Sequence, residues 1–178
     1  MTLISCTGYR RISVHPLWIL WRLSLTTHFT QEHCGLLSVS FFCFFKKTRV
    51  SGAALLLSMG IALLVGEVGL KNVICRERPC MVDPNVTLAI TPPTSFSCPS
   101  GHTGSSFAAA GGIFAFNKKL GIPALVLAII IGFSRMYLFV HFPTDVLFGA
   151  VVGLLSALTV YFVFRLTKVD RRLQGEKV

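Results

Sequence analysis

The feature that most constrains this chain is a series of apolar segments with basic clusters between them. A transmembrane helix needs about 20 mainly apolar residues to cross about 30 Å of hydrocarbon. The candidate segments are residues 53–70, 103–116, 120–141 and 146–164, of which the second is the shortest. They predict an all-α protein, built as a bundle of transmembrane helices with about four crossings.

The composition agrees with a membrane protein. Of the 178 residues, 53% are hydrophobic and 13% are charged, whereas soluble domains carry about a quarter charged residues. The net charge is +10, but the basic residues cluster at the ends of apolar runs, as in segments that anchor to a bilayer. The composition therefore favours membrane lipids over nucleic acid as partners.

Three polar motifs lie at the ends of the apolar segments. They are Lys71 with Arg78-Pro79, then Pro99-Ser100-Gly101-His102, then Ser134-Arg135 with His141 and Asp145. They supply cations, two imidazoles, one carboxylate and the backbone N–H groups of a helix start. Phosphoryl transfer without a metal needs this set, because cations stabilise the phosphoryl oxygens, one imidazole attacks and the other delivers a proton. The motifs predict a phosphoryl-transfer site near a membrane surface.

The last motif indicates a paired histidine and carboxylate. His141 and Asp145 are four residues apart, so in a helix both would point to one face. Because Pro143 lies between them and proline is tolerated only in the first turn of a helix, we expect His141 just outside the helix that Asp145 enters. The carboxylate would hold one ring N–H and leave the other nitrogen free to attack phosphorus. An interfacial histidine beside a capping aspartate is the structural alternative.

The second motif is expected to open a helix. The unpaired N–H groups and the positive dipole end of a helix start favour an anion, and Gly101 lets the backbone approach it closely. Ser100 can serve as the N-cap of the same helix. His102, as an imidazolium, can protonate a leaving oxygen.

Charge also predicts how the chain crosses the membrane. With four crossings, the basic clusters at 46–49, 118–119 and 165–177 share one face, which the positive-inside rule makes cytoplasmic. The three motifs then share the extracytoplasmic face. Lys71, Arg76 and Arg78 lie on the wrong side for anchoring, and Arg135 is costly to bury in a span. We therefore expect Lys71, Arg78 and Arg135 to form a phosphate clamp.

These motifs and their spacings resemble the three-part signature of the phosphatidic acid phosphatase type 2 superfamily, K-x6-RP, PSGH and SR-x5-H-x3-D. The resemblance covers roughly residues 53–165. It implies that His141 is the nucleophile with Asp145 as its partner, that His102 is the general acid, and that water then attacks the phosphoenzyme. No metal or other cofactor is expected.

The resemblance implies an integral membrane phosphatase that acts on a lipid phosphate or diphosphate. The small size and compact loops are similar to those of bacterial members that dephosphorylate lipid carriers or phospholipid precursors. Undecaprenyl diphosphate is the first expected substrate, and phosphatidylglycerophosphate or phosphatidic acid is the alternative. An alternative of another class is a non-catalytic lipid-phosphate-binding or permease-like bundle, which needs the clamp but not both histidines.

The chain divides into three expected regions. Residues 51–165 form the core, and residues 166–178 form a basic cytoplasmic tail. Residues 1–50 form a divergent region, because residues 36–45 are too short to span and Arg22 interrupts the apolar run before them. That region is interpreted as a poorly formed span, an interfacial segment or an altered start, and no cleavable signal is expected.

Several other residues carry structural expectations. Cys80 and Cys98 bracket the loop between the first two motifs and can pair on an oxidising side, although an unpaired thiol at each is favoured. Glu67 is expected to reach toward Lys71, and Arg76 to pair with Glu77 at the surface.

Small residues recur every fourth position in two of the apolar segments. They are Gly104, Ala108 and Gly112 in segment 103–116, and Gly149 and Gly153 in segment 146–164. Such spacing favours close packing of helices in lipid.

Overall fold

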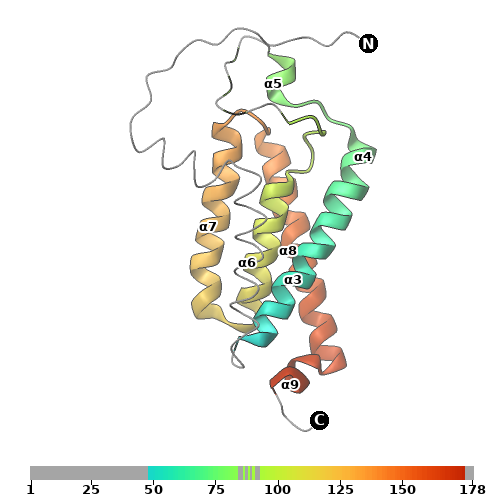
Figure 1. Cartoon of the computed structure of the whole chain (residues 1–178), viewed down its shortest axis with the longest axis vertical. Helices are drawn as coiled ribbons and strands as arrows, with labels where there is room; N and C mark the ends of the chain where they lie inside the picture. The colour runs from blue at the N-terminus through green and yellow to red at the C-terminus, as the bar shows by residue number, and fades with distance from the viewer. Residues whose placement is uncertain (1–47, 84–85, 87, 89, 91–92, 175–178) are drawn as a thin grey trace.

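The computed structural model describes residues 48–83, 86, 88, 90 and 93–174 (Figure 1). Its helices are α3 (Arg49–Leu63), the π-helix η1 (Leu64–Leu70), α4 (Lys71–Ile74), α5 (Pro79–Val82), α6 (Gly101–Phe116), α7 (Lys118–Tyr137), α8 (Pro143–Thr167) and α9 (Val169–Gln174). Within these ranges there is no strand, so the predicted all-α bundle is confirmed. Most of the divergent N-terminal region lies outside the described residues.

Four helical rods make up the described bundle. α3 continues through η1 into α4 as one rod, and α6 packs against α3, α7 and α8 (Figure 1). The largest interface is that between α6 and α8. α6 is therefore the central helix, and its N-terminus carries the second sequence motif.

Glycines allow the close approach of α6 to its neighbours. A Cβ added at Gly153 of α8 would lie 2.8 Å from the backbone nitrogen of Ala108 in α6. A Cβ added at Gly112 of α6 would lie 2.9 Å from the backbone of Ala54 in α3. Both distances are shorter than real contacts allow, so the small residues at these positions set the interhelical separation.

Three stretches are long and apolar enough to cross a membrane, namely Arg49–Val82, Lys118–Tyr137 and Pro143–Thr167. α6, with 16 residues, is shorter than a typical span, so the expected four crossings stay a prediction. The predicted segment 120–141 ends earlier than expected, at Tyr137, and α8 already begins at Pro143. The turn between them leaves His141 outside both helices.

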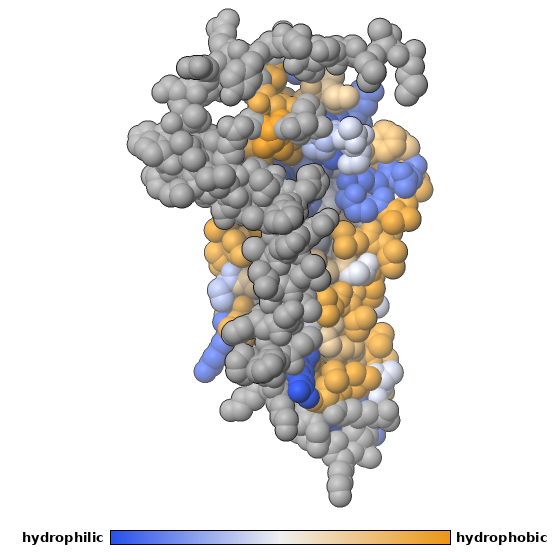
Figure 2. All heavy atoms as spheres, viewed as in Figure 1, coloured by the Kyte–Doolittle hydropathy of each residue, from blue (hydrophilic) through white to orange (hydrophobic). Residues whose placement is uncertain are grey.

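The surface of the rods suits a lipid environment. Large apolar side chains such as Ile129, Phe133, Leu155 and Phe162 are exposed on α7 and α8. Figure 2 shows the same property as orange surface along the visible shaft, with blue residues toward the ends. Together with the three stretches long and apolar enough to cross a membrane, this surface indicates a membrane protein.

The two ends of the bundle differ in chemistry. α3 begins at Arg49, α7 begins at Lys118, and Arg165 lies in the last turn of α8, all at the lower end in Figure 1. α4, the start of α6, the end of α7 and the start of α8 lie at the opposite end. All three sequence motifs belong to these opposite-end segments, so the structure separates them from the basic end as expected.

Candidate active site

The segment from α7 to α8 places a histidine and an aspartate side by side. The chain turns at Phe139, whose φ of 56° is in the left-handed region, and α8 starts at Pro143. Asp145 lies in the first turn of α8, where its Oδ2 accepts the backbone N–H of Phe142 at 2.9 Å. His141 therefore lies just outside the helix that Asp145 enters, as the position of Pro143 predicts.

A serine lies between His141 and Asp145. The His141 Nδ1 and the Asp145 Oδ2 are 3.9 Å apart. The Ser97 hydroxyl donates to that Oδ2 at 2.6 Å and lies 3.4 Å from Nδ1. Ser97 is fully buried, and its donated proton leaves a lone pair that can accept the Nδ1 proton. Ser97 was not among the predicted site residues, because one serine in a loop rich in serine and threonine carries no distinguishing signal.

Arg78 determines which ring nitrogen of His141 holds the lone pair. The Arg78 Nη1 lies 3.2 Å from the His141 Nε2 and also donates to the Val140 carbonyl at 3.0 Å. A guanidinium can only donate, so Nε2 is the acceptor and Nδ1 carries the proton. Burial, with the nearby Arg78 and Lys71 charges, lowers the pKa of His141 from 6.5 to about 3. His141 is thus a neutral imidazole whose electron pair is at Nε2 and faces Arg78 in the resting protein.

The loop before the second motif fixes the guanidinium of Arg78. Its Nε donates to the Ser95 carbonyl at 2.7 Å, and its Nη2 donates to the Ser95 hydroxyl at 3.0 Å and to the Phe96 carbonyl at 3.2 Å. Arg78 is buried. Because these bonds engage Nε and Nη2 while Nη1 faces the imidazole, the cation is held rigidly beside the Nε2 lone pair of His141.

Lys71 is paired with Glu67, one turn earlier in the same rod. The Lys71 Nζ lies 2.7 and 2.8 Å from the two carboxylate oxygens and 3.5 Å from the Ser95 hydroxyl. The expected reach of Glu67 toward Lys71 is therefore observed. Ser95 contacts both Lys71 and Arg78, so the loop joins the two predicted clamp residues of the first motif.

The second motif opens α6 against α8. Ser100 occupies the N-cap position, but its side chain makes no capping bond; its hydroxyl accepts from Thr103 Oγ1 at 3.0 Å. The Ser100 N–H donates to the Asp145 carbonyl at 3.0 Å. Gly101 is the first helical residue, and His102, half-buried, follows it on the first turn. The helix start is thus tied to the segment that carries His141.

Arg135 is the third predicted clamp residue. It lies in the last turn of α7 and is buried, and its Nε donates to the Ser134 hydroxyl at 3.1 Å. Its carbonyl accepts the N–H of Val140, next to His141, at 3.3 Å. The third motif therefore begins and ends at the same end of the bundle as the first two.

Arg76 has a different partner from the one expected. Its Nη1 donates to Asp145 Oδ1 at 2.8 Å and to the Thr144 hydroxyl at 2.6 Å, and its guanidinium lies 4.1 Å from the centre of the Phe142 ring. The predicted surface pair with Glu77 was wrong, because Arg76 turns toward the start of α8 to neutralise a buried carboxylate. These partners are 68 and 69 residues away in the sequence, so no local pattern could reveal them.

The cysteines near the site are thiols. No disulfide joins Cys80 and Cys98, and both are buried. Burial and the neighbouring Asp145 raise the pKa of the Cys98 thiol.

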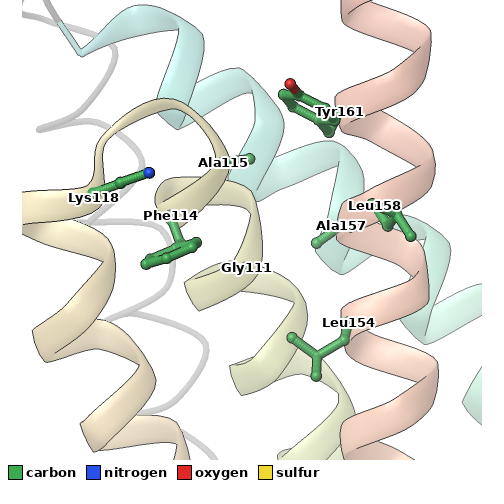
Figure 3. Close-up of a pocket in the computed structure, with 8 residues that line it drawn as sticks. All are labelled: Gly111, Phe114, Ala115, Lys118, Leu154, Ala157, Leu158 and Tyr161. Atoms are coloured by element: carbon green, nitrogen blue, oxygen red, sulfur yellow. The ribbon is translucent and has the colours of Figure 1, made fainter.

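An apolar hollow lies away from the motifs, between α6 and α8 (Figure 3). The residues that line it include Phe114, Lys118, Leu158 and Tyr161. Its lining contains none of the motif residues. The hollow is therefore separate from the motif residues.

Comparison with known proteins finds a matching family model and several similar proteins. The family model described as PAP2 superfamily matches residues 51–168. A bacitracin transport permease protein, BcrC, from Bacillus licheniformis is 35% identical over 65% of this chain and 57% of its own length. The undecaprenyl-diphosphatase of Sulfolobus acidocaldarius is 37% identical over 61% of this chain and 53% of its own length. The phosphatidylglycerophosphatase B of Bacillus subtilis is 36% identical over 63% and 57%.

Solved structures show the same fold. A transmembrane PAP2-type phosphatidylglycerolphosphate phosphatase from Bacillus subtilis superposes with a TM-score of 0.64 at 28% identity, covering 86% of this chain and 79% of that one. LpxE from Aquifex aeolicus superposes with a TM-score of 0.67 at 24% identity, covering 83% and 87%. In sequence, the chain matches only a little over half the length of the curated relatives.

Proposed function

This chain belongs to the PAP2 superfamily, and from that membership we propose that it is an integral membrane phosphatase that hydrolyses a lipid phosphate or diphosphate. The observation that carries the proposal is the state of His141: a buried, neutral imidazole whose Nε2 lone pair lies 3.2 Å from the Arg78 guanidinium. A nucleophile and a cation for the phosphoryl oxygens are thus held together before any substrate binds.

The proposed reaction has two steps. In the first, the His141 Nε2 attacks phosphorus, the bond from phosphorus to the leaving oxygen breaks, and His102 gives that oxygen a proton. In the second, water gives a proton to His102 and attacks the phosphohistidine, the nitrogen–phosphorus bond breaks, and inorganic phosphate is released. Asp145, acting through Ser97, stabilises the imidazolium that forms in the first step.

The cations are proposed to hold the phosphoryl group during both steps. Arg78 adjoins the attacking nitrogen, and Lys71, Arg135 and the N–H groups at the start of α6 complete the phosphate clamp. Ser100 and Gly101 contribute through that helix start. Arg78, which the Ser95 and Phe96 groups hold in place, supplies positive charge for the transition state from a fixed position.

Undecaprenyl diphosphate is the proposed substrate, because a relative with that activity is 37% identical and an extracytoplasmic site would meet such a carrier at the outer leaflet. Phosphatidylglycerophosphate or phosphatidic acid is the second candidate, supported by the Bacillus subtilis relative and solved structure. Both candidates use the same phosphoryl chemistry, and the panel described below separates them.

The alternative to a phosphatase, from another functional class, is a non-catalytic permease-like or lipid-phosphate-binding bundle. One relative is named as a transport permease protein. Binding alone needs the cations but not a histidine backed by Ser97 and Asp145, so that network favours catalysis.

The test is release of inorganic phosphate from a panel of lipid mono- and diphosphates by the detergent-solubilised protein. We expect turnover of at least one lipid, and loss of it in His141→Ala by on the order of a thousandfold or more. His141→Ala should still bind orthovanadate, because the cations remain. Turnover that survives in His141→Ala contradicts the proposed nucleophile. Wild-type binding without turnover of any lipid in the panel favours the binding bundle.

A further inference from the structure

Glu67 places a negative charge within the proposed phosphate clamp. Both of its carboxylate oxygens contact the Lys71 Nζ, at 2.7 and 2.8 Å. The two partners differ in burial, because the Lys71 side chain is 6% exposed and the Glu67 side chain is 35% exposed. A carboxylate at this position opposes the binding of a phosphoryl group, which is also an anion.

The same carboxylate also lies against the start of α6. A Cβ added at Gly101 would overlap a Glu67 oxygen and would lie 2.9 Å from the carboxylate carbon. Glu67 thus occupies the space between the Lys71 ammonium and the N-terminus of α6, where backbone N–H groups attract anions. Those are two of the groups proposed to hold the substrate, so the carboxylate stands where a phosphoryl oxygen would bind.

The exposure of the two side chains decides which one moves. Lys71 is buried, and the folded protein would be destabilised if its charge had no counter-ion, because an unpaired buried charge is costly. Glu67 is more than a third exposed and lies against the start of α6 at the site end of the bundle, so it is the partner with room to turn away. It also lies within η1, and π-helical turns are frequent at functional sites.

We propose that Glu67 is a displaceable internal anion that occupies part of the phosphate site in the resting protein and competes there with phosphoryl groups. The proposal rests on the proposed phosphatase function. When substrate binds, Lys71 exchanges the carboxylate for phosphoryl oxygens. After hydrolysis, the carboxylate returns to Lys71 and displaces inorganic phosphate. Glu67 is therefore a residue that sets anion affinity, and it takes no part in bond breaking.

The test is a comparison of Glu67→Gln with Glu77→Gln. Glutamine keeps the shape of the side chain and removes the charge, and Glu77 is an exposed carboxylate near the same end of the bundle, so its variant controls for general electrostatics. Binding of inorganic phosphate and of orthovanadate is measured from their stabilisation of the detergent-solubilised protein against heat. We expect Glu67→Gln to bind both anions about tenfold more tightly, ~1.4 kcal/mol, and Glu77→Gln to remain within about twofold of wild type.

In turnover, Glu67→Gln should show a lower KM and stronger inhibition by product phosphate. Unchanged or weaker anion binding in Glu67→Gln overturns the proposal, because it would make Glu67 a structural support for Lys71. An equal gain in Glu77→Gln overturns it as well. If Glu67→Gln cannot be purified, Glu67→Asp, which withdraws the carboxylate by one methylene, should bind both anions about two- to threefold more tightly, and no gain overturns the proposal.

The two proposals fail in different ways. Anion binding is measured without substrate, so it does not depend on finding the right lipid. If the wild type turns over a lipid and Glu67→Gln leaves anion binding unchanged, the internal-anion proposal is rejected and the phosphatase proposal stands. Absence of turnover across the lipid panel, with tighter anion binding in Glu67→Gln, rejects the phosphatase and leaves an anion site regulated by Glu67.

Discussion

At the scale of single residues, Ser97 is the least expected member of the site. It joins His141 to Asp145 through one hydroxyl group, with 2.6 Å to the carboxylate and 3.4 Å to the imidazole. We expect Ser97→Ala to lower kcat by about 10- to 100-fold, because the Nδ1 proton loses a buried acceptor worth about 1–3 kcal/mol. KM should change little, since Ser97 is not a clamp residue. Steady-state kinetics on the lipid that gives turnover measure this, and an unchanged kcat would show that Asp145 acts without the serine.

The burial of His141 also predicts how stability depends on pH. Its pKa is lowered to about 3 in the folded protein, whereas the ordinary value is 6.5. Between these values the unfolded chain binds more protons than the folded one, so the contribution of His141 to stability increases with pH, by up to about 1.4 kcal/mol per unit. It is lost as the pH falls from about 6.5 toward 3. His141→Asn should unfold in detergent with a weaker acid dependence than wild type; parallel pH profiles would contradict the burial of a neutral imidazole.

At the scale of helices, the contact of α6 with α8 positions the site. Gly153 faces Gly104 and Ala108 so closely that a methyl group there must displace backbone. We expect Gly153→Ala to destabilise the protein by about 1–3 kcal/mol through overpacking. Gly60→Ala on α3 is the matched control, because a Cβ there meets nothing within 4 Å and alanine favours a helix. Thermal unfolding in detergent compares the two, and equal effects would contradict the tight interface.

Much of the arrangement of the helices could be predicted from the sequence. The lengths of the apolar segments predicted the helical rods. Small residues at every fourth position predicted a packing face, and Pro143 predicted the start of α8. The π-helix η1 and the end of α7 at Tyr137 were not predictable. Both depend on how backbone bonds rearrange where a rod meets the polar end, which hydropathy does not record.

At the scale of the whole molecule, charge asymmetry predicts the orientation in the membrane. The basic end is proposed to face the cytoplasm and the site end the outside. Cys75 is exposed at the site end, just after α4. In intact cells, a membrane-impermeant maleimide should label Cys75 in a variant whose other cysteines are replaced. A second variant has its single cysteine at the basic end, through Lys119→Cys, and has Cys75 replaced as well. That cysteine should react only after the cells are permeabilised. The reverse pattern would place the site in the cytoplasm.

By itself, the sequence determined the class of protein and predicted a set of reacting groups. Hydropathy predicted a helical membrane bundle, and three motifs named two histidines, one aspartate and three cations, because such patterns are local along the chain. Only the tertiary structure decided which groups touch: Ser97 between His141 and Asp145, Arg76 on Asp145 instead of Glu77, and Glu67 between Lys71 and the start of α6. The reason is physical. Each buried charge needs a partner, and the packing of α6 against its neighbours determines which distant residue can supply it.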